Sequence, residues 1–194
     1  MIAGLILAAG ESSRMGSDKA LLAYRGRTFL ESIILNLRNA GIGKIVVVLG
    51  HHAEEIQRAV DLAGVQVVFN RDYQRGQTSS VQAGLAALQE FSPEAVILCL
   101  VDHPAVSAAV MTKLKDRFEG ARPAVVIPTC EGQHGHPVVI GRELFSELLV
   151  LRPDEGANTV VRNYRAATQF VEVDDRGILL DVDDPETYEC LEHD

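Results

Sequence analysis

Short, nearly continuous apolar segments recur along the chain, and this feature most narrows the folds open to it. They are rich in Val and Ile, and they are Leu5–Ala8, Ile45–Leu49, Val65–Phe69, Ala95–Val101, Ala124–Pro128 and Pro137–Ile140. A strand with one face in solvent alternates apolar and polar residues, whereas a strand covered on both faces is apolar throughout. The pattern therefore predicts strands buried within a mostly parallel sheet.

Amphipathic segments of helical period separate these expected strands. Thr28 precedes Glu31 by three residues, the spacing of a capping box, and an apolar stripe then continues until Gly41. Further helices are expected over 52–63, over 79–89 and after Ser107, which precedes another apolar stripe. Strand and helix alternate up to about residue 128, and this order is typical of a doubly wound α/β sheet.

The alternation weakens in the last third of the chain. Strands are expected over 138–140, 169–173 and 178–180, with helices over 142–151 and 156–164 and a last helix starting at Pro185. Late antiparallel strands would make the sheet mixed but still mostly parallel. Because no linker, repeat or low-complexity segment divides the sequence, we expect one domain over residues 1–194.

Charge and cysteine content exclude several classes of function. The net charge is −9 and the pI about 5.1, so the overall field opposes binding to nucleic acid or to an anionic membrane. A small polyanion could still be bound by a local cluster of backbone N–H groups, cations or a metal. The three cysteines are widely spaced, without a disulfide or zinc-ribbon pattern, which favours the cytoplasm. The apolar segment Ile2–Ala9 is too short for a membrane span and lacks the basic start of a signal peptide.

The segment from Leu7 to Lys19 follows the first expected strand. Ligands of open α/β sheets bind beyond the carboxyl ends of strands, so this loop is the expected ligand site. Five residues separate Gly10 from Gly16 and no Lys follows Gly16, so the loop is not a Walker A motif. It also lacks GxGxxG, which argues against a dinucleotide-binding oxidoreductase.

Small residues and cations give this loop its chemistry. Ala8, Ala9 and Gly10 would let a nucleotide approach the backbone closely. Arg14 and Lys19 follow at fixed offsets, and they could bind phosphate oxygens as a bidentate donor and a point charge. The alternative is an ordinary strand-to-helix turn with exposed charges.

Aspartates stand at two further positions that suit a metal. Asp102 directly follows the most apolar expected strand, where a carboxylate needs a cation or hydrogen bonds. It could be a Mg²⁺ ligand or a helix-capping residue. Asp181, Asp183 and Asp184 form an acidic cluster before Pro185, and the first two share a side of an extended segment. A charged helix N-terminus is the alternative there, and Asp184 fits it well.

Five segments in order resemble the MobA-like nucleotidyltransferases, in particular their molybdenum cofactor cytidylyltransferase branch. They are LAAGESSRMGSDKALL at 7–22, the segment 70–81, Val-Asp-His-Pro at 101–104, Gly-His-Pro at 135–137 and LDVDDPE at 180–186. The resemblance spans nearly the whole chain. It implies the nucleotide-diphospho-sugar transferase type of α/β fold, a Rossmann variant.

The resemblance also implies site residues. Arg14, Lys19 and Asp102 would be catalytic, Asp102 and Asp183 would hold Mg²⁺, and His136 would lie near the acceptor. The nucleotide would be bound by Leu7, Ala8, Ala9, Gly10, Arg14, Lys19, Asn70, Gly76 and Ser80.

The same resemblance implies the reaction. LAAG rather than LAGG resembles the cytidylyl branch, so the expected donor is CTP. An acceptor phosphate, as in molybdopterin, would attack the α-phosphorus and release pyrophosphate, and a molybdoenzyme apoprotein is a possible partner. Val101, His103 and Asp184 depart from the usual motifs, which leaves the acceptor open.

Other functions remain as alternatives. A sugar or polyol phosphate could be the acceptor instead, or the chain could be a non-catalytic nucleotide- or cofactor-binding chaperone for molybdoenzyme maturation. The presence of two cations and two metal carboxylates disfavours pure binding. A zinc pair at His134 and His136 is a minor alternative, and His51 and His52 are expected to be solvated or to cap a helix.

Overall fold

The computed structural model describes residues 1–12, 15–152 and 155–192. Its strands are β1 (Ile2–Ala8), β2 (Ala23–Tyr24), β3 (Arg27–Thr28), β4 (Ile45–Leu49), β5 (Gln66–Phe69), β6 (Ala95–Leu100), β7 (Val125–Cys130), β8 (Gln133–His134), β9 (Val138–Gly141) and β10 (Thr168–Glu172). The α-helices are α1 (Phe29–Asn39), α2 (Ala53–Ala59), α3 (Gln77–Leu88), α4 (Ala108–Ala121), α5 (Phe145–Leu149), α6 (Ala157–Asn163) and α7 (Pro185–Glu192). Short 3₁₀ helices are η1 (Lys19–Leu21), η2 (Tyr73–Arg75), η3 (Gln89–Phe91), η4 (Arg142–Leu144), η5 (Arg165–Ala167) and η6 (Arg176–Ile178).

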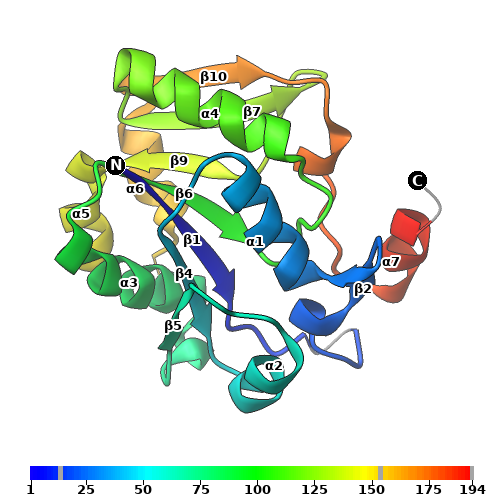
Figure 1. Cartoon of the computed structure of the whole chain (residues 1–194). Coiled ribbons are helices and arrows are strands. Elements are labelled where there is room, and N and C mark those ends of the chain that lie inside the picture. Colours follow the sequence, from blue (N-terminus) through cyan, green and yellow to red (C-terminus); the bar gives the residue numbers. More distant parts are fainter. Residues whose placement is uncertain (13–14, 153–154, 193–194) are drawn as a thin grey trace.

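One mixed sheet forms the centre of the molecule, in the order β10-β7-β9-β6-β1-β4-β5, with β8 paired to β7 (Figure 1). β9 is antiparallel to β6 and β7, while β1 pairs in parallel with β4 and β6, β4 with β5, and β10 with β7. This confirms the predicted α/β class with a mostly parallel sheet.

The prediction of a strand over 178–180 is wrong. Ile178 is instead the last residue of the 3₁₀ helix η6, at whose start the Asp175 side chain accepts a hydrogen bond from the Gly177 N–H, and Leu179 and Leu180 follow it without forming a strand. The helix expected over 142–151 is broken into η4 and α5, and the one expected over 52–63 ends at Ala59.

Helices cover both faces of the sheet, as the continuous apolar strands require (Figure 1). Alternate residues of β1 contribute to the two faces. Ile2 and Ile6 belong to the apolar core that contains α1, α2 and α4, and Leu5 and Leu7 to the core that contains α3, α5 and α6. The predicted capping box at the start of α1 is confirmed, since Thr28 and Glu31 exchange both hydrogen bonds.

The strand order reverses beside β1. The chain passes from β1 to β4 and β5 on one side and then returns to β6 on the other side of β1. Leu7 pairs with Leu100 and Ala8 with Leu49, so the carboxyl ends of three parallel strands meet at one edge. Such a switch point is where open α/β sheets bind ligands.

The carboxyl-terminal segment folds back onto this edge. A small apolar cluster joins Val182 and Leu191 to Phe29, and the Tyr188 hydroxyl donates a hydrogen bond to the Ala23 carbonyl (2.9 Å). In Figure 1 α7 lies beside the β2–β3 hairpin. Residues near position 183 are thereby placed next to residues near position 19. Within the described residues, none of the helices is long and apolar enough to cross a membrane.

Candidate active site

A cleft of about 340 Å³ opens at the switch point. Its walls come from the end of β1 and the loop after it, the start of α3, the end of β6 and the segment before α7. Nine residues predicted from the sequence line it: Leu7, Ala8, Ala9, Gly10, Lys19, Gly76, Ser80, Asp102 and Asp183. Arg14 lies outside the described residues.

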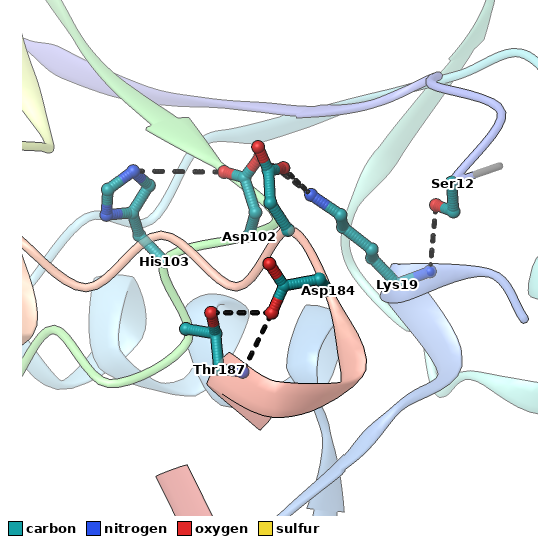
Figure 2. A network of polar contacts seen from close by, with 7 residues as sticks. Ser12, Lys19, Asp102, His103, Asp184 and Thr187 are labelled. Carbon is teal, nitrogen blue, oxygen red and sulfur yellow. Dashed lines mark hydrogen bonds and ion pairs between the residues drawn. The ribbon is translucent and has the colours of Figure 1, made fainter. Parts of the chain in front are cut away.

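Lys19 joins the two predicted metal ligands in this cleft. Its ammonium lies 2.5 Å from Asp183 Oδ1 and 3.4 Å from Asp102 Oδ2, and the contact to Asp102 is visible in Figure 2. The three residues stand at η1, directly after β6 and shortly before α7. The Lys19 side chain is 11% exposed, whereas that of Asp183 is 47% exposed, so Lys19 is the more buried partner of this ion pair. The Lys19 N–H donates to Ser12 Oγ (3.0 Å), which ties this cation to the loop after β1.

The second oxygen of Asp102 is buried and accepts no hydrogen bond from the described residues. The His103 Nε2 atom lies 3.9 Å from it, beyond hydrogen-bond distance. Asp181 also approaches, since ligand atoms of Asp102, His103 and Asp181 lie within 4.8 Å of one another. Burial, together with the charges of Asp102 and Asp183, raises the pKa of Asp181. This concentration of carboxylates around an unpaired oxygen suits a hard divalent cation.

His103 and His136 lie behind Asp102 rather than in the cleft. Their ring centroids are 5.2 Å apart, and both line a separate, smaller cavity with Met111 and Pro137. Burial lowers the pKa of His103, and burial together with the nearby His103 lowers the pKa of His136 to about 4. Both imidazoles are therefore neutral at neutral pH. The structure does not bring His136 into the cleft with the other predicted residues.

Asn70 also stands outside the cleft lining. Its Nδ2 donates to Ser79 Oγ (2.8 Å) and Ser80 Oγ (3.0 Å), and its Oδ1 accepts from the Asp72 N–H (3.0 Å). The amide is thus used within the protein, where it orients the start of α3. Gly76 precedes this helix with φ +97°, a conformation that a side chain would strain.

Several residues that line the cleft were not predicted from the sequence, among them Asp18, Tyr73, Gln77 and Leu100. Asp18 stands directly before Lys19, and its Oδ1 accepts a hydrogen bond from the Ala20 N–H (2.9 Å), which caps η1. That Asp-before-helix pattern was a usable signal. Tyr73 in η2 and Gln77 at the start of α3 lie within the segment 70–81 that resembles the family, but neither residue type by itself indicates a ligand contact.

One expectation outside the cleft needs correction. His134 is exposed and stacked on Phe170 (ring centroids 4.6 Å apart), and the residues able to form a metal cluster within the described part of the chain do not include it. The minor zinc alternative at His134 and His136 is therefore wrong. His52 occupies the N-cap position of α2 without a capping side-chain hydrogen bond, and its side chain is 47% exposed, so of the two expected roles it has the solvated one. By contrast, Asp184 does cap α7, through the Thr187 N–H and hydroxyl (Figure 2).

Comparison with known proteins identifies the family. The model of the MobA-like NTP transferase domain matches residues 4–168. The chain belongs to the MobA-like NTP transferase family. The family and its named cytidylyl- and guanylyltransferases make this chain a nucleotidyltransferase that acts on a nucleoside triphosphate.

Relatives of two named activities resemble this MobA-like chain over nearly its full length. It is 29% identical to the molybdenum cofactor cytidylyltransferase of Escherichia coli, over 95% of this chain and 92% of the relative. It is 30% identical to the nicotine blue oxidoreductase of Paenarthrobacter nicotinovorans, over 94% and 92% of the two chains.

Solved structures agree with the fold. Rv0371c from Mycobacterium tuberculosis superposes with a TM-score of 0.88 and 32% identity, over 100% of this chain and 97% of that one. A second structure of Rv0371c, with a TM-score of 0.82 and 29% identity over 99% and 98% of the two chains, is a complex with manganese. A divalent metal therefore accompanies this fold in a close neighbour.

Proposed function

We propose that this chain is a Mg²⁺-dependent cytidylyltransferase that transfers CMP from CTP to a phosphate of a small acceptor such as molybdopterin. The observation that carries the proposal is the meeting of Lys19, Asp102 and Asp183 in one cleft, from positions far apart in the sequence. A cation and two carboxylates at a switch point suit a metal–triphosphate complex. The ammonium would offset negative charge on the phosphates, and the carboxylates would offset the positive charge of the metal ion.

The donor set fits magnesium. Asp102 and Asp183 supply carboxylate oxygens, the ligands Mg²⁺ prefers, and one Asp102 oxygen is buried without a hydrogen bond from the described residues. Asp181 stands close enough to Asp102 to join them. When bound here, the ion would offset the charge on the reacting phosphates and on the leaving pyrophosphate.

The chain's own residues would bind and orient the nucleotide. Gly10 offers an approach to the backbone without a side chain, and Lys19 supplies a positive charge beside the carboxylates. Arg14 would add a bidentate phosphate donor. Ser80 and Gly76 line the opposite wall at the start of α3, where N–H groups and hydroxyls suit the ribose and base. Asn70 would act through Ser80, whose hydroxyl it holds.

The proposed reaction needs positioning more than covalent catalysis. An oxygen of the acceptor phosphate forms a bond to the α-phosphorus of CTP, and the bond from that phosphorus to the bridging β-phosphate oxygen breaks. The leaving pyrophosphate carries away the electron pair of that bond. Because the acceptor phosphate is already ionised at neutral pH, no side chain has to remove a proton. Lys19 would stabilise the negative charge that spreads over the phosphates.

Two sequence likenesses support the choice of cytidine, and the second also supports molybdopterin. The loop reads LAAG at 7–10, as in the cytidylyl branch, and a relative that covers nearly the whole chain is a molybdenum cofactor cytidylyltransferase. A molybdoenzyme apoprotein in the cytoplasm would then receive the product.

The test is pyrophosphate release from CTP, GTP, ATP and UTP with Mg²⁺, with and without molybdopterin. We expect release that requires molybdopterin and is fastest with CTP. Release that requires a sugar or polyol phosphate instead would contradict the acceptor. Absence of release with every nucleotide and acceptor would contradict the reaction and leave nucleotide binding or a redox reaction as alternatives.

Two variants test the residue roles. Lys19→Ala and Asp102→Ala should abolish turnover while the chain stays folded, as checked by its thermal transition. Lys113→Ala is the matched control, because this exposed lysine binds the Glu172 carbonyl far from the cleft and should leave turnover unchanged. Wild-type rates in either cleft variant would refute the role of that residue.

A further inference from the structure

A second group of metal-ligating side chains lies at the rim of the cleft. Asp18 precedes η1, and His51 and His52 form the turn between β4 and α2. One ligand atom from each lies within 4.8 Å of the others. None of the three belongs to the proposed magnesium group.

Two buried atoms in this group lack hydrogen-bond partners within the described residues: Asp18 Oδ2 and His51 Nδ1. The Asp18 side chain is only 4% exposed, and its Oδ2 faces His52 Nδ1 at 3.7 Å. A buried carboxylate oxygen without a hydrogen-bond partner is costly unless something binds it, so Asp18 Oδ2 is well placed to bind a cation. The other Asp18 oxygen is held by the Ala20 N–H, which fixes the carboxylate in place.

A second carboxylate, that of Glu55, lies close enough to Asp18 to act on it. Burial raises the pKa of Asp18, and the nearby Glu55 carboxylate raises it further, while the two imidazoles lower it. A divalent cation would relieve the repulsion between the carboxylates and occupy the unpaired oxygen.

The donor set selects the kind of ion. Two imidazole nitrogens and one carboxylate oxygen suit Zn²⁺ and similar transition metals, whereas Mg²⁺ prefers oxygen ligands. Two ligands of a tetrahedral zinc ion stand about 3.4 Å apart when the bonds are about 2.1 Å. The observed 3.7 Å between Asp18 and His52 is close to that separation.

We propose that Asp18, His51 and His52 form a transition-metal site, best filled by Zn²⁺ with a water as fourth ligand. The ion would tie the loop that carries Lys19 to the start of α2. Because Asp18 also lines the cleft, the metal would fix one rim of the nucleotide site. Binding of Zn²⁺ here would require neither the proposed reaction nor the carboxylates of Asp102 and Asp183.

The test is a Zn²⁺ titration of the metal-free full chain against a chromophoric chelator, run on the wild type and on Asp102→Asn. We expect both to bind one equivalent of Zn²⁺ at this site. His52→Asn removes a ligand and keeps a residue type that tolerates the left-handed backbone of position 52 (φ +52°). It should lower the affinity for Zn²⁺ by about 100-fold or more, because the loss of a residue that only supports a ligand already lowers metal affinity by about 10–100-fold.

Further variants separate this site from other histidines. Asp18→Asn and His51→Asn should weaken Zn²⁺ binding like His52→Asn, and each should abolish the tetrahedral visible spectrum of bound Co²⁺. His134→Asn is the matched control, an exposed histidine elsewhere, and should bind as the wild type does. Binding that is equally tight in His51→Asn and His52→Asn, or lost in Asp102→Asn alone, would overturn the proposal.

Discussion

Replacing Lys19 with methionine should strengthen metal binding while it lowers kcat. In the structure the ammonium occupies the carboxylates that would hold the ion, at 3.4 Å from Asp102 and 2.5 Å from Asp183. An incoming cation therefore has to displace it or bear its repulsion. Methionine keeps much of the length of the buried side chain and removes only the competing charge.

The size of the effect follows from these distances. Coulomb's law in a water-like dielectric gives about 1.2 kcal/mol for the contact to Asp102 and about 1.7 kcal/mol for that to Asp183. Asp183 is half exposed, and exposed ion pairs contribute about 0.2–1 kcal/mol each when measured. A total of about 1–2 kcal/mol remains, which corresponds to roughly 5–30-fold tighter metal binding. The loss of one charge-stabilising donor should lower kcat by about 10²–10³-fold.

The assay is a calorimetric titration of the nucleotide-free chain with Mn²⁺, beside a measurement of kcat. Asp102→Asn gives the background of ions bound elsewhere, and Lys113→Met serves as the control for loss of a distant lysine. Unchanged or weaker Mn²⁺ affinity in a folded Lys19→Met chain would refute the idea that Lys19 and the metal compete.

Three further predictions concern the surroundings of the site. Gly135→Ala would place a Cβ against the Ile178 carbonyl, well inside contact distance, so it should destabilise the chain by about 1–3 kcal/mol in urea unfolding. Thr28→Ala breaks the capping box of α1 and should lower the free energy of unfolding by about 1 kcal/mol without changing kcat. The pKa of His136 is lowered to about 4 in the fold, so the unfolded chain binds its proton first as pH falls. The contribution of His136 to the free energy of unfolding is therefore fully present above about pH 6.5. Below that pH the free energy of unfolding falls by about 1.4 kcal/mol per pH unit, until about pH 4. His136→Asn should remove that part of the pH dependence, and an unchanged profile would contradict the burial argument.

Local patterns carried most of the fold prediction. The continuous apolar strands and the capping box at Thr28 act within a few residues, so they can be identified along the chain. The segment 178–180 shows the limit of that approach. It is apolar like a strand, but its first residue ends a 3₁₀ helix that the Asp175 side chain caps, and the next two residues form no strand.

For the site, the sequence by itself determined the chemistry, and the tertiary structure decided the arrangement. Lys19, Asp102 and Asp183 could be selected because charged residues beside apolar strand ends need partners. Which groups then meet depends on contacts between distant segments, which no local pattern encodes. The strand reversal beside β1 and the return of α7 brought these three together. The same packing set Asn70 and His136 behind the cleft wall and placed Asp18 against His51 and His52.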